Sequence, residues 1–545
     1  MKTQPWLRLL AALLLAKLLL HLYLNGQWSF HRDELLYLAL GRRPAWGFAS
    51  VPPGIGFWAW LGDRVLGGSV EGIRLIATLF GTATVLLTGL MAREMLPAGE
   101  RSGRFAMLLV GLAGLVSGAF LRPCMLFMPV VFDVFYWALM CWLLMGYLRT
   151  EKRSWLWWFG LAAGFGLLNK YSVLILLFSL LPGVLFISRN RRIFSQPALY
   201  GAAGLALLLF FPNLLWQWEH RFPVVRHMSA LATTQFAHVS LESFFGDQLR
   251  FFLPALPVWL AGLYFLLFGK EASVWRLFGW MYLTVLAVLL FFSAKSYYSL
   301  GAYPVLVAAG AAYLERLSAQ NYRWIRVAAP AFILLSGIFT MPAALPLLPP
   351  EQEARFIQGL SKMPGLQGIL RWEDGNYYAL PQDYADMLGW EELGKKAGEI
   401  WQAIPDKNTA AIYADSYGQA GAIEQFGKKY GVREVLCFSD NYRYWLPDSL
   451  PANFQTLIYV NDELGDDMPG FLETSKKYGN WICPCPGNTA TRFTGVNTPP
   501  RRFSSGYTRR SGRHDGRKKL QIEEQPGYPG KRPGYSLDLL HNFGA

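Results

Sequence analysis

The first two thirds of the chain alternates long apolar runs with short polar segments. A helix needs about 20 apolar residues to cross a hydrocarbon core of about 30 Å. No small-residue cleavage pattern follows the first run, so we expect it to be retained rather than removed as a signal peptide. The pattern predicts about eleven transmembrane helices, at 7–24, 72–92, 105–121, 130–148, 155–168, 171–188, 198–215, 251–269, 275–293, 298–315 and 325–347.

Beyond about residue 350 the sequence becomes ordinary or very polar. Overall, 53% of the residues are hydrophobic and 16% are charged, against about 25% charged in a typical soluble domain. Strand patterns at 409–414 and 456–460, with a helical stretch between them, indicate a small α/β domain. We therefore expect an all-α polytopic membrane bundle at 1–349 with an outer loop at 25–71, a soluble α/β domain at 350–490, and a disordered basic tail at 491–545.

Basic residues recur in alternate loops between the apolar runs. Cytoplasmic loops carry an excess of Lys and Arg, so this alternation places the N-terminus inside and the loops at 25–71, 122–129, 216–250 and 294–297 outside, together with the soluble domain. The sequence thus predicts a multi-pass protein of the inner (plasma) membrane. The basic residues of the inner loops are Arg93, Arg101, Arg104, Arg149, Lys152, Arg153, Arg189, Arg191, Arg192, Lys270, Arg276, Arg316, Arg323 and Arg326.

The net charge of +14 arises mainly from these loops and the tail. It points to membrane lipids as partners and not to nucleic acid. Cys483 and Cys485 are too close together for a zinc knuckle. We expect unremarkable thiols, with a disulfide to Cys437 left open in an extracytoplasmic domain.

The candidate chemistry lies at the predicted outer face. Asp33 and Glu34 follow the first helix, Asp133 begins the fourth, and Lys170 and Lys295 lie in outer connections. Ionisable groups near membrane-buried sequence are costly, which favours a functional reading. The two ammonium groups could stabilise a departing phosphate, and Asp33 could act as a base towards an acceptor hydroxyl or amine. Glu34 and Asp133 would orient the site or bind a cation.

Structural explanations exist for each of these residues. Asp33 and Glu34 could complement a helix dipole, and Asp133 could pair with Arg122 or Lys170. The lysines could extend to lipid head groups. A lipid or sugar flippase is the main alternative function, but no inverted repeat is evident and the charges gather at one face instead of at mid-helix depth.

Several motifs, in order and spacing, resemble glycosyltransferase family 39. This family contains bacterial relatives of dolichyl-phosphate-mannose protein mannosyltransferases and of the aminoarabinose transferase that modifies lipid A. The resemblance covers about residues 7–480. Its motifs are Phe30-His-Arg-Asp33-Glu34-Leu-Leu-Tyr37, Val51-Pro52-Pro53, Arg74-Leu-Ile-Ala, Phe132-Asp133 with Trp137, Gly164-Phe-Gly-Leu-Leu-Asn-Lys170-Tyr, Lys295-Ser-Tyr297-Tyr298 before Ala302-Tyr-Pro304, Ala385-Asp386-Met387-Leu-Gly389-Trp390-Glu391 and Tyr417-Gly418-Gln-Ala-Gly421.

The resemblance implies a GT-C fold whose cavity takes a polyprenyl-phosphate sugar. It implies Asp33 as the main catalytic carboxylate, with Glu34 and Asp133 as further acidic candidates. Donor-phosphate contacts would come from the basic and phenolic positions of the motifs, namely Lys170, Lys295, Tyr298 and Arg74. The chain departs from the family at Gly54, where a bulky apolar residue is common, and at Ser439–Pro447, which matches a subgroup pattern only in part.

The sequence therefore predicts an integral membrane glycosyltransferase. It would move a hexose or pentose from a polyprenyl-phosphate donor to a protein or lipid acceptor outside the membrane, with inversion at the anomeric carbon. The participation of a divalent cation is left open, and so are the sugar and the acceptor.

Overall fold

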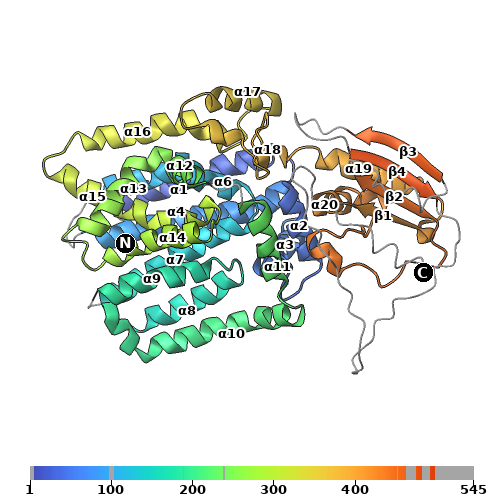
Figure 1. The fold of residues 1–545 in the computed structure, drawn as a ribbon. Coiled ribbons are helices and arrows are strands. Elements are labelled where there is room, and N and C mark those ends of the chain that lie inside the picture. The colour runs from blue at the N-terminus through green and yellow to red at the C-terminus, as the bar shows by residue number, and fades with distance from the viewer. Residues whose placement is uncertain are drawn as a thin grey trace. The chain divides into compact units, whose positions relative to one another are not determined.

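The computed structural model describes residues 5–96, 103–187, 190–236, 240–450, 452–461, 474–481 and 491–497. It divides into two compact units, a helical unit up to Leu388 and a second unit from Gly389 onwards. Figure 1 shows the helices and strands of both. The predicted tail lies outside the described residues after Asn497, as do Cys483 and Cys485; residues 491–497, which that prediction includes, form a strand.

Helices occupy all eleven predicted positions of the helical unit. They are α1 (Pro5–Leu24), α4 (Val70–Met95), α5 (Arg104–Val116) with α6 (Gly118–Met125), α7 (Pro129–Thr150), α8 (Ser154–Leu167), α9 (Val173–Phe186), α10 (Pro197–Glu219), α13 (Leu256–Phe268), α14 (Arg276–Phe291), α15 (Tyr303–Ala319) and α16 (Ile325–Thr340).

Not all of these helices are long enough to span a bilayer by themselves. Among the described residues, five are both long and apolar enough, namely α1, α4, α7, α10 and α16 with its short extension to Ala343. The count rises to seven if two bent pairs each form one span: α5 with α6, bent by 53°, and α12 (Leu241–Phe251) with the segment 253–268, bent by 72°. The chain is a multi-pass membrane protein, built from several broken or short helices in addition to continuous ones.

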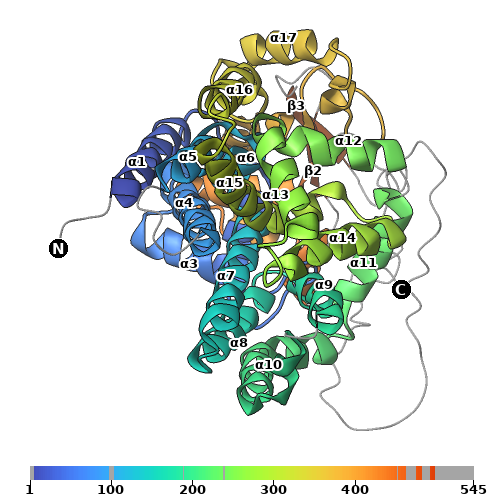
Figure 2. The same cartoon turned by 90° about the vertical axis from the view of Figure 1, so that its left-hand side faces the viewer.

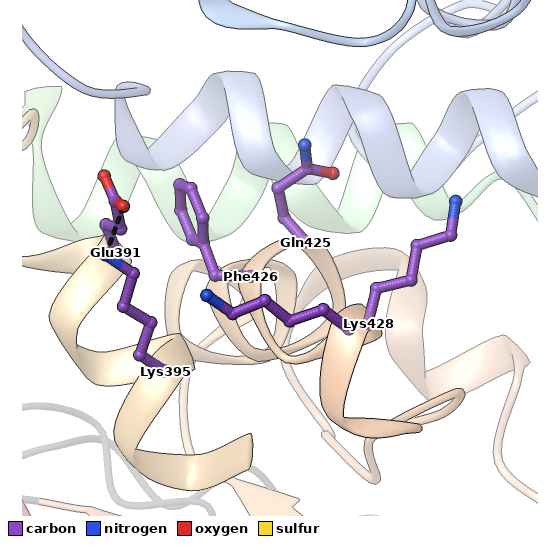
Figure 3. Close-up of a pocket in the computed structure, with 6 residues that line it drawn as sticks. Glu391, Lys395, Gln425, Phe426 and Lys428 are labelled. Atoms are coloured by element: carbon purple, nitrogen blue, oxygen red, sulfur yellow. Dashed lines mark ion pairs between the residues drawn. The ribbon is translucent and has the colours of Figure 1, made fainter. Parts of the chain in front are cut away.

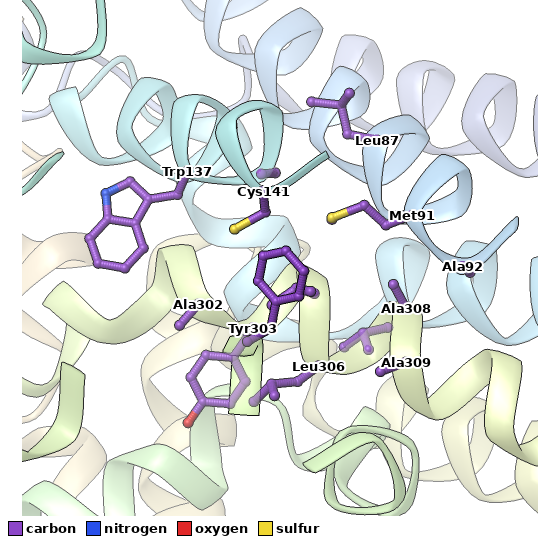
Figure 4. Close-up of a cluster of buried hydrophobic side chains, with 14 of the residues drawn as sticks. Leu87, Met91, Ala92, Trp137, Cys141, Ala302, Tyr303, Leu306, Ala308 and Ala309 are labelled. Atoms are coloured by element: carbon purple, nitrogen blue, oxygen red, sulfur yellow. The ribbon is translucent and has the colours of Figure 1, made fainter. Parts of the chain in front are cut away.

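The core of the helical unit lies between α4, α7 and α15. Figure 4 shows Met91, Trp137, Cys141 and Leu306 from these helices packed together, and all four are fully buried. Close helix contact depends on glycine, as is common in membrane bundles. A Cβ at Gly310 would clash with the carbonyl oxygen of Val258 in α13. The outward faces carry exposed apolar side chains, as expected for contact with lipid; on α10 these are Leu207, Leu208, Phe211, Leu214, Leu215 and Trp218.

Shorter elements connect the helices at the predicted outer face, except for the 3-10 turn at Asn190–Ser195, which lies in a predicted inner loop. Figure 2 gives a second view of the unit. These elements are α2 (Arg32–Arg42), α3 (Gly54–Val65), α11 (Pro223–Thr234), α17 (Pro350–Ser361) and α18 (Gln382–Ala385), with 3-10 turns η1 (Asn190–Ser195), η3 (Leu253–Ala255), η4 (Ser296–Ala302), η5 (Met341–Ala343) and η6 (Gln367–Leu370).

The helical unit extends to residue 388, beyond the boundary expected at 349. The additional segment is anchored by Tyr384. The Trp28 ring meets the Tyr384 ring edge-on at 5.2 Å, and the Arg122 guanidinium lies 4.0 Å from the centre of the same ring. The hydroxyl group of Tyr384 donates to the carbonyl of Pro342 at 2.8 Å. The polar composition of this segment therefore does not show that it packs against the helical unit through a buried side chain.

The second unit is the small α/β domain that the sequence predicts. Its sheet has the order β1-β2-β4-β3, with β1 and β2 parallel and the other two pairs antiparallel. Two helices, α19 and α20, pack against each other. The bounds are α19 (Trp390–Gln402), β1 (Ala410–Ala414), α20 (Tyr417–Phe426), β2 (Thr456–Asn461), β3 (Thr474–Trp481) and β4 (Thr491–Asn497), with short turns η7 (Lys407–Thr409), η8 (Lys428–Tyr430) and η9 (Asp440–Tyr444).

Candidate active site

The first outer loop turns into α2 at His31, which places Asp33 and Glu34 in the first helical turn. The His31 side chain accepts from the backbone N–H of Asp33 at 3.0 Å, and Glu34 accepts from the backbone N–H of His31 at 2.7 Å. This reciprocal capping box fixes the start of the helix. Consecutive helical positions are about 100° apart, so the two carboxylates point in different directions.

Glu34 points into the protein and pairs with Arg74. Both side chains are fully buried, and Arg74 donates to the carboxylate through Nε at 3.0 Å and through Nη2 at 2.8 Å. The backbone N–H of Phe127 also donates to Glu34, at 2.8 Å. Burial by itself would raise the pKa of Glu34, but Arg74 and these backbone donors overcome it and hold the pKa below its ordinary value.

Arg74 also organises the backbone of the outer loop. Its guanidinium donates to the carbonyls of Asn25, Trp28 and Ser29 at 2.8, 3.0 and 2.7 Å. With these bonds and the Glu34 pair, all N–H donors of the Arg74 guanidinium are used in contacts inside the protein. Arg74 therefore ties the loop after α1 to α2.

Asp33 points to the other side and is partly exposed, at 28%. Its carboxylate lies 3.6 Å from the Nε of Arg32. The backbone N–H of Arg32 donates to the carbonyl of Asp386 at 2.8 Å, and the Arg32 side chain lies 3.4 Å from the Asp386 carboxylate. Burial raises the pKa of Asp386, against the opposing effects of Arg32 and His31, and the nearby Asp33 charge also raises it.

A second acidic position lies at the outer end of α7, where Asp133 is almost completely buried. The hydroxyl group of Ser172 donates to Asp133 at 2.7 Å, and Lys170 Nζ lies 3.9 Å from the other carboxylate oxygen. Lys170 lies in the short connection between α8 and α9. Burial lowers the pKa of Lys170; Asp133 opposes this and the neighbouring ammonium of Lys295 adds to it.

Lys295 reaches the same place from the connection between α14 and α15. Lys170 Nζ lies 5.1 Å from the centre of the Tyr297 ring, and Lys295 Nζ lies 5.9 Å from the same centre. Lys170 also lies 4.7 Å from the centre of the Tyr298 ring. The structure thus brings Asp133, Lys170, Lys295 and Tyr298 together, and we call these four residues with Tyr297 the lysine cluster.

Buried contacts hold the Lys295 connection in place. Gly301 packs on Trp137, and a Cβ at Gly301 would lie 2.5 Å from that ring. Trp137 is one turn from Asp133 on the same face of α7. The hydroxyl groups of Ser299 and Tyr303 both donate to Gln248 Oε1 at 2.7 Å, which secures the connection to α12.

The Lys170 connection is held by the start of α3. The backbone N–H of Gly54 donates to the carbonyl of Leu168 at 2.7 Å, and a Cβ at Gly54 would lie 2.7 Å from Asn169. Gly54 is the position at which the sequence departs from the family, and this close approach explains why a larger residue does not fit.

The lysine cluster and α2 are neighbours through Tyr37, one turn after Asp33. Burial first, and then the nearby groups of Tyr298, Glu373 and Tyr37, raise the pKa of Tyr297 well above its ordinary value. Tyr37 of α2 therefore contributes to the electrostatic surroundings of the lysine cluster.

Three polar side chains of this region have no assigned role in the sequence prediction. Ser172 orients Asp133, Tyr297 lies under both ammonium groups, and Glu373 forms an ion pair with Lys295. Tyr297 stands in the Lys-Ser-Tyr-Tyr motif, where it could have been identified. Glu373 lies 78 residues after its partner, in a turn without a recognisable pattern.

Within the described residues, no group of three or more His, Cys, Asp or Glu side chains is placed to hold a metal ion. The participation of a divalent cation stays an untested expectation. A separate pocket of about 440 Å³ lies in the second unit, between α19 and the region of α20 and η8 (Figure 3). Its lining residues are Glu391, Lys395, Gln425, Phe426, Lys428 and Lys429, none of which is a predicted site residue.

Comparison with solved structures identifies the fold. ArnT from Cupriavidus metallidurans matches with a TM-score of 0.59 in the apo state and 0.61 when bound to undecaprenyl phosphate. The identities are 13% and 14%, and the matches cover 91% and 90% of this chain and 98% of the ArnT chain in both cases. At this identity the likeness establishes the fold, which is of the GT-C type. None of the curated proteins matches the sequence.

The outer-face site therefore lies on a fold similar to that of ArnT. The family model of dolichyl-phosphate-mannose-protein mannosyltransferase matches residues 50–216, the segment from just before α3 in the first outer loop to the last turn of α10. The family resemblance predicted from the sequence motifs is thereby confirmed, and the comparisons support a membrane glycosyltransferase.

Proposed function

We propose that this protein transfers a sugar from a polyprenyl-phosphate donor to a protein or lipid acceptor outside the membrane. The observation that carries the proposal is the convergence of Lys170 and Lys295 on one aromatic platform beside Asp133. Two ammonium groups in a partly buried place suit a phosphate that gains charge as its bond to the sugar breaks. ArnT, which has the same fold, has been solved with undecaprenyl phosphate bound.

The reaction requires a base, a leaving group and a fixed geometry. Asp33 accepts the proton of the acceptor hydroxyl or amine while that atom attacks the anomeric carbon. The bond from the anomeric carbon to the phosphate oxygen breaks, and its electron pair stays on the phosphate. Lys170 and Lys295 neutralise this charge, with Tyr298 beside them. Direct displacement from the opposite face inverts the anomeric centre.

The remaining predicted site residues fit a supporting role in this scheme. Glu34 and Arg74 are buried against each other, so the geometry favours positioning of the Asp33 turn over contact with the donor. Asp133 holds Lys170 at a fixed place. The site would face the periplasm of a bacterial inner membrane, in keeping with the basic inner loops.

Replacement of Asp33 by Asn tests the assigned base. Asp33→Asn should abolish release of polyprenyl phosphate and appearance of the glycosylated acceptor, both measured by mass spectrometry, while membrane insertion is unchanged. Glu242→Gln, at an exposed carboxylate in the first turn of α12, is the charge-matched control and should retain transfer. Undiminished transfer by Asp33→Asn would remove Asp33 from the mechanism.

The flippase alternative predicts a different product. A flippase would move the intact polyprenyl-linked sugar to the outer face without releasing polyprenyl phosphate. Release of polyprenyl phosphate that depends on an acceptor favours transfer, and translocation without release favours the alternative.

A further inference from the structure

One of the two cluster lysines is already occupied by an anion from the protein itself. The Glu373 carboxylate forms an ion pair with Lys295. A carboxylate and a phosphate present similar anionic oxygens to an ammonium group. The Glu373 carboxylate therefore lies where the proposed donor would place a phosphate oxygen.

Glu373 is presented by a small turn, which we call the 371–378 hairpin. The backbone N–H of Trp372 donates to Asn376 at 2.8 Å, and that of Gly375 donates to Trp372 at 3.0 Å. The Trp372 ring stacks on Tyr378 with 3.9 Å between ring centres. Bonds to residues outside the hairpin hold its backbone in place: the Glu373 N–H donates to Gln382 Oε1 at 2.9 Å, and the Trp372 indole donates to the carbonyl of Leu380 at 2.8 Å. The part that can move is therefore the Glu373 side chain, whose carboxylate accepts only a long bond of 3.5 Å from Gln382 besides its ion pair with Lys295.

The two acidic partners of the cluster lysines differ in how firmly they are held. Asp133 is 3% exposed and bound to Ser172, whereas Glu373 is 40% exposed. An exposed carboxylate can return to water at little cost, but a buried one cannot. If an anion enters the cluster, Glu373 is the carboxylate that can leave.

We propose that Glu373 occupies Lys295 while the site is empty and is displaced by the donor phosphate. The inference rests on the proposed function, because it takes Lys295 as a donor-phosphate contact. A phosphate arriving beside Glu373 is repelled by a like charge, so the donor reaches Lys295 only when the Glu373 side chain turns away into water. Between turnovers Glu373 balances the charge of Lys295, as Asp133 does that of Lys170.

The test measures binding of undecaprenyl phosphate to the full-length protein in lipid nanodiscs. Glu373→Gln removes the competing charge, so the dissociation constant of undecaprenyl phosphate should fall by about 2- to 5-fold in this variant, the value of one partly exposed ion pair. Asp374→Asn is the matched control: Asp374 lies in the same turn, but it bonds Asn376 and Tyr378. The Asp374→Asn variant should bind undecaprenyl phosphate with the same affinity as the wild type.

A third variant separates this inference from the proposed function. Lys295→Met should weaken binding of undecaprenyl phosphate; if it binds as tightly as the wild type, the donor site itself is misassigned. If Lys295→Met weakens binding but Glu373→Gln binds no more tightly than the wild type, competition by Glu373 is refuted and the donor site stands. Weaker binding by Glu373→Gln would likewise refute it, because Glu373 would then be assisting the donor.

Discussion

At the scale of single residues, adjacent carboxylates in one helical turn have separate environments. Asp33 faces Arg32 and is partly exposed, whereas Glu34 is buried and fully bonded. A buried ion pair is strongly destabilised when one partner is removed, because the other charge is left without compensation. Substitution of Glu34 should therefore lower the stability of the folded protein, whereas substitution of Asp33 should leave the stability nearly unchanged.

Glu34→Gln should lower the stability of folded protein by about 3 to 5 kcal/mol, since Arg74 would remain charged and buried without a counterion. Thermal unfolding of the purified protein followed by intrinsic fluorescence measures this effect. Asp33→Asn, one residue away, is the control and should unfold within a few degrees of the wild type. A Glu34→Gln variant with unchanged stability and no transfer would assign Glu34 to the chemistry itself.

At the scale of elements, the segment after α16 contains a buried acid that responds to pH. Glu353 in α17 is fully buried and accepts from the backbone N–H of Leu348 at 3.0 Å. Burial raises the pKa of Glu353 to about 7, against the opposing effect of the backbone donors and Arg122. The folded state therefore holds a proton that the unfolded chain releases near its ordinary pKa of 4.5.

The stabilising contribution of protonated Glu353 is fully present below about pH 4.5 and is lost as the pH rises through about 7. Glu353→Gln mimics the protonated form, so at pH 8 it should stabilise α17 by about 3 kcal/mol relative to the wild type. Hydrogen exchange of peptides from 345–361 at pH 5 and pH 8 measures this. Glu351→Gln, on the exposed side of the same helix, should change nothing; equal pH dependence in wild type and Glu353→Gln would contradict the account.

Element positions followed from the sequence because apolar runs and basic loops each have a direct physical cause. The same reasoning placed Lys170 and Lys295 on one membrane face, and the structure brings them to one tyrosine ring. The burial of the Glu34 side chain could not be predicted, because the sequence does not tell which face of a short outer helix packs against the protein. The partner of Lys295 was missed because Glu373 comes from a distant turn without periodicity.

At the scale of the whole molecule, the helical unit contains more than the membrane bundle. The segment 350–388 has the composition of a soluble domain, yet it contributes Tyr384 to Arg122 and Trp28, Glu373 to Lys295, and Asp386 to Arg32. A small number of anchoring side chains in a polar stretch does not produce a hydropathy signal. A boundary drawn from composition alone therefore fell too early.

The central claim is that Lys170 and Lys295 together hold the phosphate of a polyprenyl carrier. Equilibrium binding of undecaprenyl phosphate to the Lys170→Met/Lys295→Met double variant tests it most directly, with thermal unfolding as a check on folding. Lys152→Met/Lys270→Met, in loops predicted to lie on the opposite face, is the matched control. The account predicts a loss of affinity of about 100-fold or more in the first variant and none in the control. Wild-type affinity in a folded Lys170→Met/Lys295→Met protein would contradict it.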